Sequence, residues 1–162
     1  MNIEINNSLS KEILFDGDDE LFKRLIKNIN IYFEYGVGKS TEYIYKYSKS
    51  DIYAVDTSKL WVQKINKLSS KDSRLNLKWI NVGEVGNWGY PKSFELRKNF
   101  TFYTDWFWKQ DLSPDLVLID GRFRISCFLT TLRNAQEGTK ILFKRGLRAP
   151  KVIIARIKTV EI

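Results

Sequence analysis

The sequence contains no histidine among its 162 residues, and only one cysteine, one methionine and three prolines. Histidine is the commonest general base and the commonest transition-metal ligand, so its absence excludes Ser-His and Cys-His catalysis. One cysteine without histidine also excludes the usual zinc sites, which take four such ligands. We therefore expect no metal site, and any chemistry must use Asp, Glu, Lys, Tyr, Arg or the reactivity of a ligand.

Long apolar runs are missing as well. No stretch approaches the roughly 20 apolar residues of a membrane span, and the N-terminus lacks the basic and apolar regions of a signal peptide. The single cysteine, Cys127, lies in an apolar helix-like run and is typical of a small core residue. These features favour a cytoplasmic protein that does not act in a membrane.

The composition is that of one folded, basic domain. A hydrophobic fraction of 43% excludes a disordered chain, and residues 1–162 fit a single domain with a lead-in helix over 1–29 and an atypical basic tail over 144–162. The formal net charge of +8 is compatible with a nucleic-acid partner. Because most basic residues lie beside acidic ones, and only the C-terminal tail is acid-poor, the sequence does not favour that partner.

The most informative stretch is an apolar run, residues 31–35, that contains Glu34 and leads into a turn with two glycines, Gly36 and Gly38. Such a run is typical of a buried parallel strand, and glycines just beyond its end let the backbone approach a ligand closely. The helix that follows would point its unpaired amide groups at the same place. The pattern indicates a nucleotide-binding loop, and an ordinary strand-to-helix turn is the alternative.

Two well-known motifs can be tested against this loop. A P-loop requires a glycine five residues before Gly38, where this chain has Phe33, so the triphosphate hypothesis fails. A dinucleotide fingerprint requires a third glycine at Thr41, which weakens NAD or FAD without excluding them. What remains is the looser pattern of an acid followed by two alternating glycines.

Strand-like and helix-like segments alternate along the chain. The strands are predicted at 31–35, 52–55, 75–82, 116–119 and 139–143, with one further strand within 151–162. The helices are predicted at 18–28, 39–47, 58–68, 104–110 and 123–135. In the helix over 58–68 we expect Ser58 as the cap and a buried stripe of Leu60, Trp61, Ile65 and Leu68. This alternation predicts a parallel sheet that helices cover on both faces.

Three acidic residues fall at or near the carboxyl ends of predicted strands, namely Glu34, Asp56 and Asp120. In a parallel sheet these ends meet at one edge, and ligands bind outside that edge where the strand order reverses. The three acids therefore predict one shared site.

Four segments carry a resemblance to a known family: Glu34-Tyr-Gly-Val-Gly, Asp56 with Trp61 five residues later, the loop 85–91 and the segment 117–124. In order and spacing they resemble small bacterial and phage-type proteins related to class I S-adenosylmethionine-dependent methyltransferases, over roughly residues 30–143. The resemblance implies a Rossmann-like three-layer α/β sandwich. Its sheet would be mostly parallel in the order 3-2-1-4-5, with helices on both faces and a reduced C-terminal part.

The resemblance also implies S-adenosylmethionine as the cofactor and assigns residues to its site. Asp120 would orient the nucleophile or take its proton, and Arg122 would pair with an anionic acceptor or with Asp120; a structural ion pair is the alternative. The residues implied to bind the cofactor lie in three loops: Glu34, Tyr35, Gly36 and Gly38; Asp56 and Thr57; and Gly83, Glu84 and Val85.

The sequence also departs from the family. Lys39 stands where a small residue is usual, and strand four lacks the signature of amino-methylating nucleic-acid enzymes. The tail over 144–162 leaves room for one further strand only, which leaves open a homo-oligomer formed through the reduced sheet edge. The favoured function is methyl transfer to a small-molecule or saccharide-type acceptor. A module that binds S-adenosylmethionine without transfer, and an enzyme that cleaves it, remain alternatives.

Overall fold

The computed structural model describes residues 14–15, 19–68, 72–86, 90–144 and 151–153. These residues form a six-stranded sheet in the order β3-β2-β1-β4-β5-β6. Strands β1 to β5 are parallel to one another, and β6 is antiparallel to β5. The strands are β1 Ile31–Tyr35, β2 Asp51–Asp56, β3 Leu75–Trp79, β4 Leu116–Ile119, β5 Lys140–Phe143 and β6 Lys151–Ile153.

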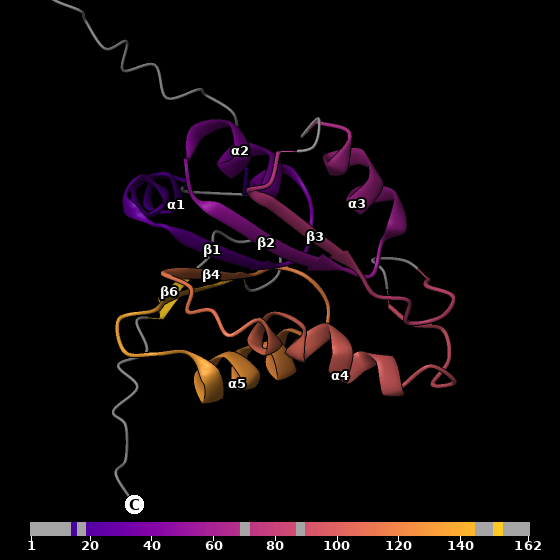
Figure 1. Cartoon of the computed structure of the whole chain (residues 1–162). Helices are drawn as coiled ribbons and strands as arrows, with labels where there is room; N and C mark the ends of the chain where they lie inside the picture. The colour runs from indigo at the N-terminus through magenta and orange to yellow at the C-terminus, as the bar shows by residue number, and fades with distance from the viewer. Residues whose placement is uncertain (1–13, 16–18, 69–71, 87–89, 145–150, 154–162) are drawn as a thin grey trace, which may run out of the picture.

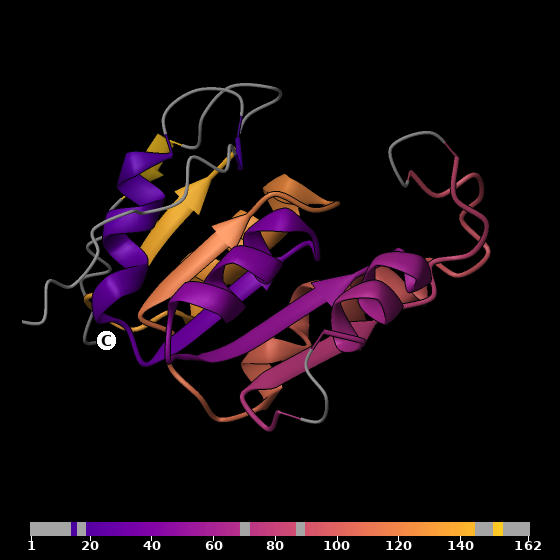
Figure 2. The ribbon, with the colours of Figure 1, turned by 90° about the horizontal axis from the view of Figure 1, so that it is seen from above.

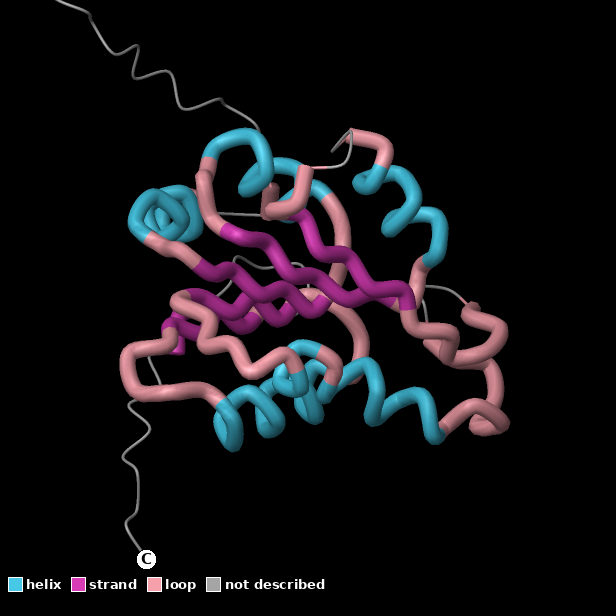
Figure 3. The backbone as a smooth tube through the Cα atoms, viewed as in Figure 1, coloured by secondary structure: helices cyan, strands magenta, loops and turns pink. Residues whose placement is uncertain are grey.

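Helices cover both faces of the sheet, so that the described chain has three layers (Figures 1 and 3). One outer layer holds α1 Glu20–Leu25, which continues as a 3-10 turn over Ile26–Asn28, together with α2 Lys39–Tyr47 and α3 Lys59–Asn66. The other holds α4 Lys98–Asp105, a 3-10 turn over Phe107–Lys109 and α5 Arg124–Asn134. The predicted α/β sandwich, the order 3-2-1-4-5 and the further strand after β5 are confirmed.

Alternation along β1 divides the core into two. Tyr32 packs in the apolar cluster under α1 and α2, whereas Phe33 and Tyr35 pack in the cluster under α4 and α5. Successive side chains of a strand point to opposite faces, which explains this division. Glu34 therefore points to the side of α2, away from Tyr35.

The carboxyl ends of β1, β2 and β4 are level with one another. Tyr35 pairs with Val55 of β2 on one side and with Ile119 of β4 on the other. The chain leaves β1 for the α2 face and leaves β4 for the α5 face, so the strand order reverses between these two strands (Figure 2). A crevice at the end of β1 and β4 is where such sheets bind ligands.

Two sequence predictions about element boundaries are wrong. Strand β3 ends at Trp79 rather than at residue 82, because the Ile80 amide donates to the Asp56 carbonyl and the chain then leaves the ladder. The helix predicted at 104–110 is instead α4 over 98–105 and a separate 3-10 turn. The aromatic residues of this segment pack against the sheet, but they do not recur at helical spacing in the sequence.

Of the buried stripe predicted for α3 only Ile65 is confirmed, whereas Leu60, Trp61 and Leu68 are exposed; the predicted cap is confirmed. Ser58 accepts a hydrogen bond from the Trp61 amide (3.4 Å). The helix packs through Val62 and Ile65, whereas Leu60 is 79% exposed. The sequence places apolar residues on both sides of this short helix, and only contact with β2 and β3 decides which side is buried.

Within the described part of the chain, no helix is both long and apolar enough to cross a membrane. Cys127 is a free, buried residue of the core under α4 and α5, as predicted.

Candidate functional site

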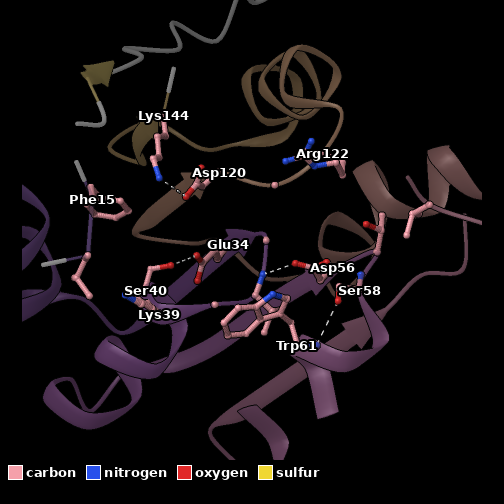
Figure 4. A pocket seen from close by; sticks show the side chains of 17 residues that line it. Phe15, Glu34, Lys39, Ser40, Asp56, Ser58, Trp61, Asp120, Arg122 and Lys144 are labelled. Atoms are coloured by element: carbon pink, nitrogen blue, oxygen red, sulfur yellow. Dashed lines mark hydrogen bonds and ion pairs between the residues drawn. The ribbon is translucent and has the colours of Figure 1, made fainter. Parts of the chain in front are cut away.

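A cavity of about 730 Å³ lies at the carboxyl ends of β1, β2 and β4 (Figure 4). The structure brings together all three strand-end acids on its wall. Of the residues that the sequence assigned to a site, the cavity is lined by Glu34, Gly36, Gly38, Asp56, Thr57, Val85, Asp120 and Arg122. Its other lining residues are Leu14, Phe15, Val37, Lys39, Ser40, Ser58, Trp61, Gly121 and Lys144.

Three residues assigned to the site from the sequence do not line this cavity. The Tyr35 side chain points to the opposite face, where its hydroxyl donates to the Thr104 carbonyl (2.6 Å) and accepts from Trp108 Nε1 (2.8 Å). Gly83 and Glu84 lie in the loop after β3, and Glu84 forms an exposed ion pair with Lys92. The part of this loop over residues 87–89 lies outside the described residues.

Two glycines form the floor of the cavity where the β1–α2 and β4–α5 loops meet. Gly36 has a φ of +118°, and a Cβ on it would lie 3.2 Å from the Gly121 amide nitrogen. A Cβ on Gly121 would lie 2.8 Å from the carbonyl carbon and oxygen of Tyr35 and would overlap the hydroxyl of Tyr103. The two loops can therefore touch only because neither residue has a side chain.

Glu34 is almost fully buried, and hydroxyl groups from the first turn of α2 bind it. Ser40 donates to one carboxylate oxygen and Thr41 donates to the other (2.8 Å). The Gly38 amide in turn donates to the Thr41 hydroxyl (3.0 Å). Burial raises the pKa of Glu34 to about 8, against the opposing effect of these hydroxyl groups. This network fixes the start of α2 relative to β1.

Asp56 ends β2 and organises two loops through backbone amides. One carboxylate oxygen accepts from the Val37 amide (2.7 Å) and the other from the Ser58 amide (2.6 Å). Burial raises its pKa, and these amides oppose the rise. Each oxygen keeps a second acceptor position, because a carboxylate offers about four.

Asp120 directly follows β4 and pairs with two cationic side chains. One oxygen accepts from Lys144 Nζ (3.2 Å), and the other accepts from the Arg124 guanidinium (3.4 Å). Burial raises the pKa of Asp120, and Lys144 and both neighbouring arginines oppose the rise. The resemblance implied either an anionic acceptor or Asp120 as the partner of Arg122, and in the structure Asp120 pairs with Arg124 and Lys144 instead.

Two aromatic residues line opposite parts of the cavity wall (Figure 4). Trp61, in the first turn of α3, is 38% exposed, and Lys64 covers its ring at 4.5 Å from the centroid. Phe15 is buried against Phe22, and Lys144 lies 5.3 Å from its ring centroid. Trp61 was assigned to the core of α3 from the sequence, but it belongs to the cavity.

Lys144 and Phe15 are the lining residues that sequence reasoning missed most clearly. Ile119 pairs with Phe143, so the residues that follow them, Asp120 and Lys144, are neighbours. The strand order 1-4-5 together with the position of Asp120 was enough to find Lys144. Phe15 offered no comparable signal, because no periodicity or motif connects a lead-in segment to a strand end.

Among the described residues, no group of three or more Cys, Asp and Glu side chains has the arrangement of a metal site. The acids at the cavity are occupied by hydroxyl, amide and cationic donors instead.

The parallel sheet, its order and a ligand-sized cavity at the β1/β4 reversal define the class of this fold. The chain has the Rossmann-like class I fold of S-adenosylmethionine-dependent methyltransferases, as the resemblance in sequence implies.

The comparison with solved structures supports this fold. No family model matches the sequence, and no curated protein matches it. Among solved structures, it is similar to a methyltransferase-like protein from Silicibacter pomeroyi DSS-3, with 25% identity and a TM-score of 0.70. That match covers 76% of this chain and 68% of the other.

Two further matches are looser. N-methyltransferase NodS from Bradyrhizobium japonicum WM9, in complex with S-adenosyl-L-homocysteine, has 10% identity, a TM-score of 0.47 and coverage of 76% of this chain and 57% of its own. The MycE methyltransferase of the mycinamycin biosynthetic pathway has 15% identity, a TM-score of 0.47 and coverage of 78% and 30%. This chain therefore spans only part of their length.

Proposed function

We propose that the chain binds S-adenosylmethionine in this cavity and transfers its methyl group to a small-molecule or saccharide-type acceptor. One observation carries the proposal: three strand-end carboxylates, Glu34, Asp56 and Asp120, line a single cavity above a glycine floor at the reversal of strand order. The solved structure of a methyltransferase-like protein with the same fold supports it.

The residues present fit a nucleoside with a diol and a planar base. Asp56 keeps free acceptor positions on both oxygens for two adjacent ribose hydroxyls. Lys64 covers one face of the Trp61 ring. Trp61 also lines the cavity and would offer an aromatic surface to adenine. The contact between Gly36 and Gly121 holds the β1–α2 and β4–α5 loops together at the floor of the cavity.

A positively charged residue at the start of α2 suits the carboxylate at the methionine end of the cofactor. Lys39 is exposed at the first position of α2 and lines the cavity, so its charge would attract the carboxylate of that portion. Lys39 is also where this chain departs from related loops.

Bound S-adenosylmethionine supplies a methyl group that is activated by its sulfonium. The chain supplies orientation and a proton acceptor. Asp120 is held at the cavity wall by Lys144 and Arg124, so its carboxylate is fixed before an acceptor binds. Because burial raises its pKa, it takes a proton more readily than an exposed aspartate does.

Isothermal titration calorimetry tests the cofactor. S-adenosylmethionine and S-adenosylhomocysteine should bind the wild-type chain, and Asp56→Ala should weaken both by about 1–3 kcal/mol through lost hydrogen bonds to a charged acceptor. Asp51→Ala is the matched control, because Asp51 is exposed at the opposite end of the same strand. Unchanged affinity in a folded Asp56→Ala variant would mean that the nucleoside does not bind here.

Product analysis separates three activities on the same ligand. Formation of S-adenosylhomocysteine with a methylated acceptor supports transfer. A methylthio-nucleoside would indicate cleavage of the cofactor, and an unchanged ligand after prolonged incubation with an acceptor panel would indicate a binding module. The last two results contradict the proposal.

A further inference from the structure

Three cationic side chains stand near Asp120, and two of them, Arg124 and Lys144, form ion pairs with it. The Arg124 guanidinium donates to the carbonyls of Gly121 (3.1 Å), Lys144 (3.2 Å) and Asp120 (3.2 Å), and to the Asp120 carboxylate. Lys144 Nζ donates to the other oxygen of that carboxylate. The charge of Asp120 is therefore compensated within the chain, and Arg124 ties the β4 and β5 ends together.

Arg122 differs from both. Its side chain is half-buried and lines the cavity, yet its guanidinium makes no hydrogen bond or ion pair with any residue of the described ranges. Its contact is with the ring face of Tyr90, 4.9 Å from the centroid. A contact through the face of the guanidinium leaves its in-plane N–H groups available as donors.

The nearby carboxylates do not use these donors. Burial raises the pKa of Asp56 and of Asp120, and the charge of Arg122 opposes both rises, so it acts on both groups. Asp56, however, accepts from backbone amides, and Asp120 accepts from Arg124 and Lys144. Arg122 therefore has charged neighbours but no hydrogen-bonded acceptor among the described residues, and an anionic ligand would supply one.

We propose that the methyl acceptor is a small anionic molecule whose carboxylate or phosphate group binds Arg122. This inference rests on the proposed function, because it concerns the second ligand of the same cavity. The planar fork of an arginine matches either anion through two parallel hydrogen bonds. Arg122 is then a residue that determines acceptor specificity, and it is no part of the Asp120 ion-pair cluster.

The test uses the full chain saturated with S-adenosylhomocysteine and four aromatic probes of similar size. Benzoate and phenyl phosphate should shift protein NMR signals on titration, whereas benzyl alcohol and benzylamine should not. The first two probes also show which anion is preferred. Arg122→Gln should weaken anion binding about tenfold or more, while its affinity for S-adenosylhomocysteine stays near the wild-type value.

Arg133→Gln is the matched control, because Arg133 is exposed in the last turn of α5, the helix that follows Arg122. It removes the same charge and should leave both affinities unchanged. Equal binding of benzyl alcohol and benzoate, or unchanged anion binding by Arg122→Gln, would overturn the inference. Binding of a single-stranded oligonucleotide in preference to the small anions, lost in Arg122→Gln, would overturn it in favour of nucleic acid.

Failure of the proposed function gives a different result. If S-adenosylhomocysteine does not bind the wild-type chain, the cofactor assignment is wrong, and the same anion titration of the free chain still decides whether Arg122 binds anions.

Discussion

Replacing Glu34 with glutamine should change how stability depends on pH. Glu34 is 1% exposed, and burial raises its pKa from an ordinary value of 4.5 to about 8. The folded state therefore holds the proton more tightly than the unfolded state does. The stabilisation is fully present below about pH 4.5, declines as the pH rises, and is lost above about pH 8.

The magnitude of this loss follows from the difference between the ordinary pKa of 4.5 and the raised pKa of about 8. One pKa unit corresponds to about 1.36 kcal/mol, so the loss between about pH 5 and about pH 9 is about 4 kcal/mol of unfolding free energy. Glutamine resembles the protonated acid in shape and hydrogen bonding and cannot ionise. The Glu34→Gln variant should therefore gain about 4 kcal/mol on the wild type between these two pH values.

Urea unfolding of both proteins at several pH values measures this difference. Glu137→Gln serves as the control, since Glu137 is an exposed carboxylate in the turn before β5 and the substitution is the same. A difference between wild type and Glu34→Gln that stays constant from acid to alkaline pH would refute the reasoning. It would mean that the hydroxyl groups of Ser40 and Thr41 stabilise an ionised carboxylate in spite of its burial.

Two further predictions concern the floor and the wall of the cavity. Gly121→Ala should lower the unfolding free energy by about 1–3 kcal/mol in urea unfolding, because its Cβ would overlap the Tyr35 backbone. Gly38→Ala is the control and should be tolerated, since a Cβ at that position has open space around it. Equal stabilities of the two variants would contradict the close contact between the loops. Trp61→Ala should weaken S-adenosylhomocysteine binding by about 1–3 kcal/mol in calorimetry, the usual worth of stacking a base on an aromatic ring, with unfolding unchanged, and an unaltered affinity would place adenine elsewhere.

The strands that bear the site could be predicted from the sequence with little error. The predicted ranges 31–35 and 116–119 match β1 and β4, because each is a short apolar run with turn residues or acids at both ends. Strand β3 was predicted too long, since Ile80 and Val82 are buried without belonging to the ladder. Burial and strand pairing give the same apolar signal in a sequence.

The site was predicted as far as it depends on strand ends. Glu34, Asp56 and Asp120 meet at one cavity because a parallel sheet brings its carboxyl ends together. The partners of these acids were harder to foresee. Arg122 and Arg124 are two residues apart in the sequence, and the intervening Phe123 has a left-handed backbone with a φ of 52°, which no sequence pattern here predicted.

The occupied hydrogen bonds of the three acids change what each can do. Glu34 is bound by α2 hydroxyls and Asp120 by two cations, so neither is a free anion in the cavity. Asp56 accepts hydrogen bonds from backbone amides, and no charged side chain is hydrogen-bonded to it among the described residues. The cavity therefore provides one carboxylate for a diol, one carboxylate fixed beside its counter-ions, and one cation, Arg122, that still requires an anion. The carboxylate of the cofactor is assigned to Lys39 at the start of α2, so we expect the anion at Arg122 to come from the other substrate.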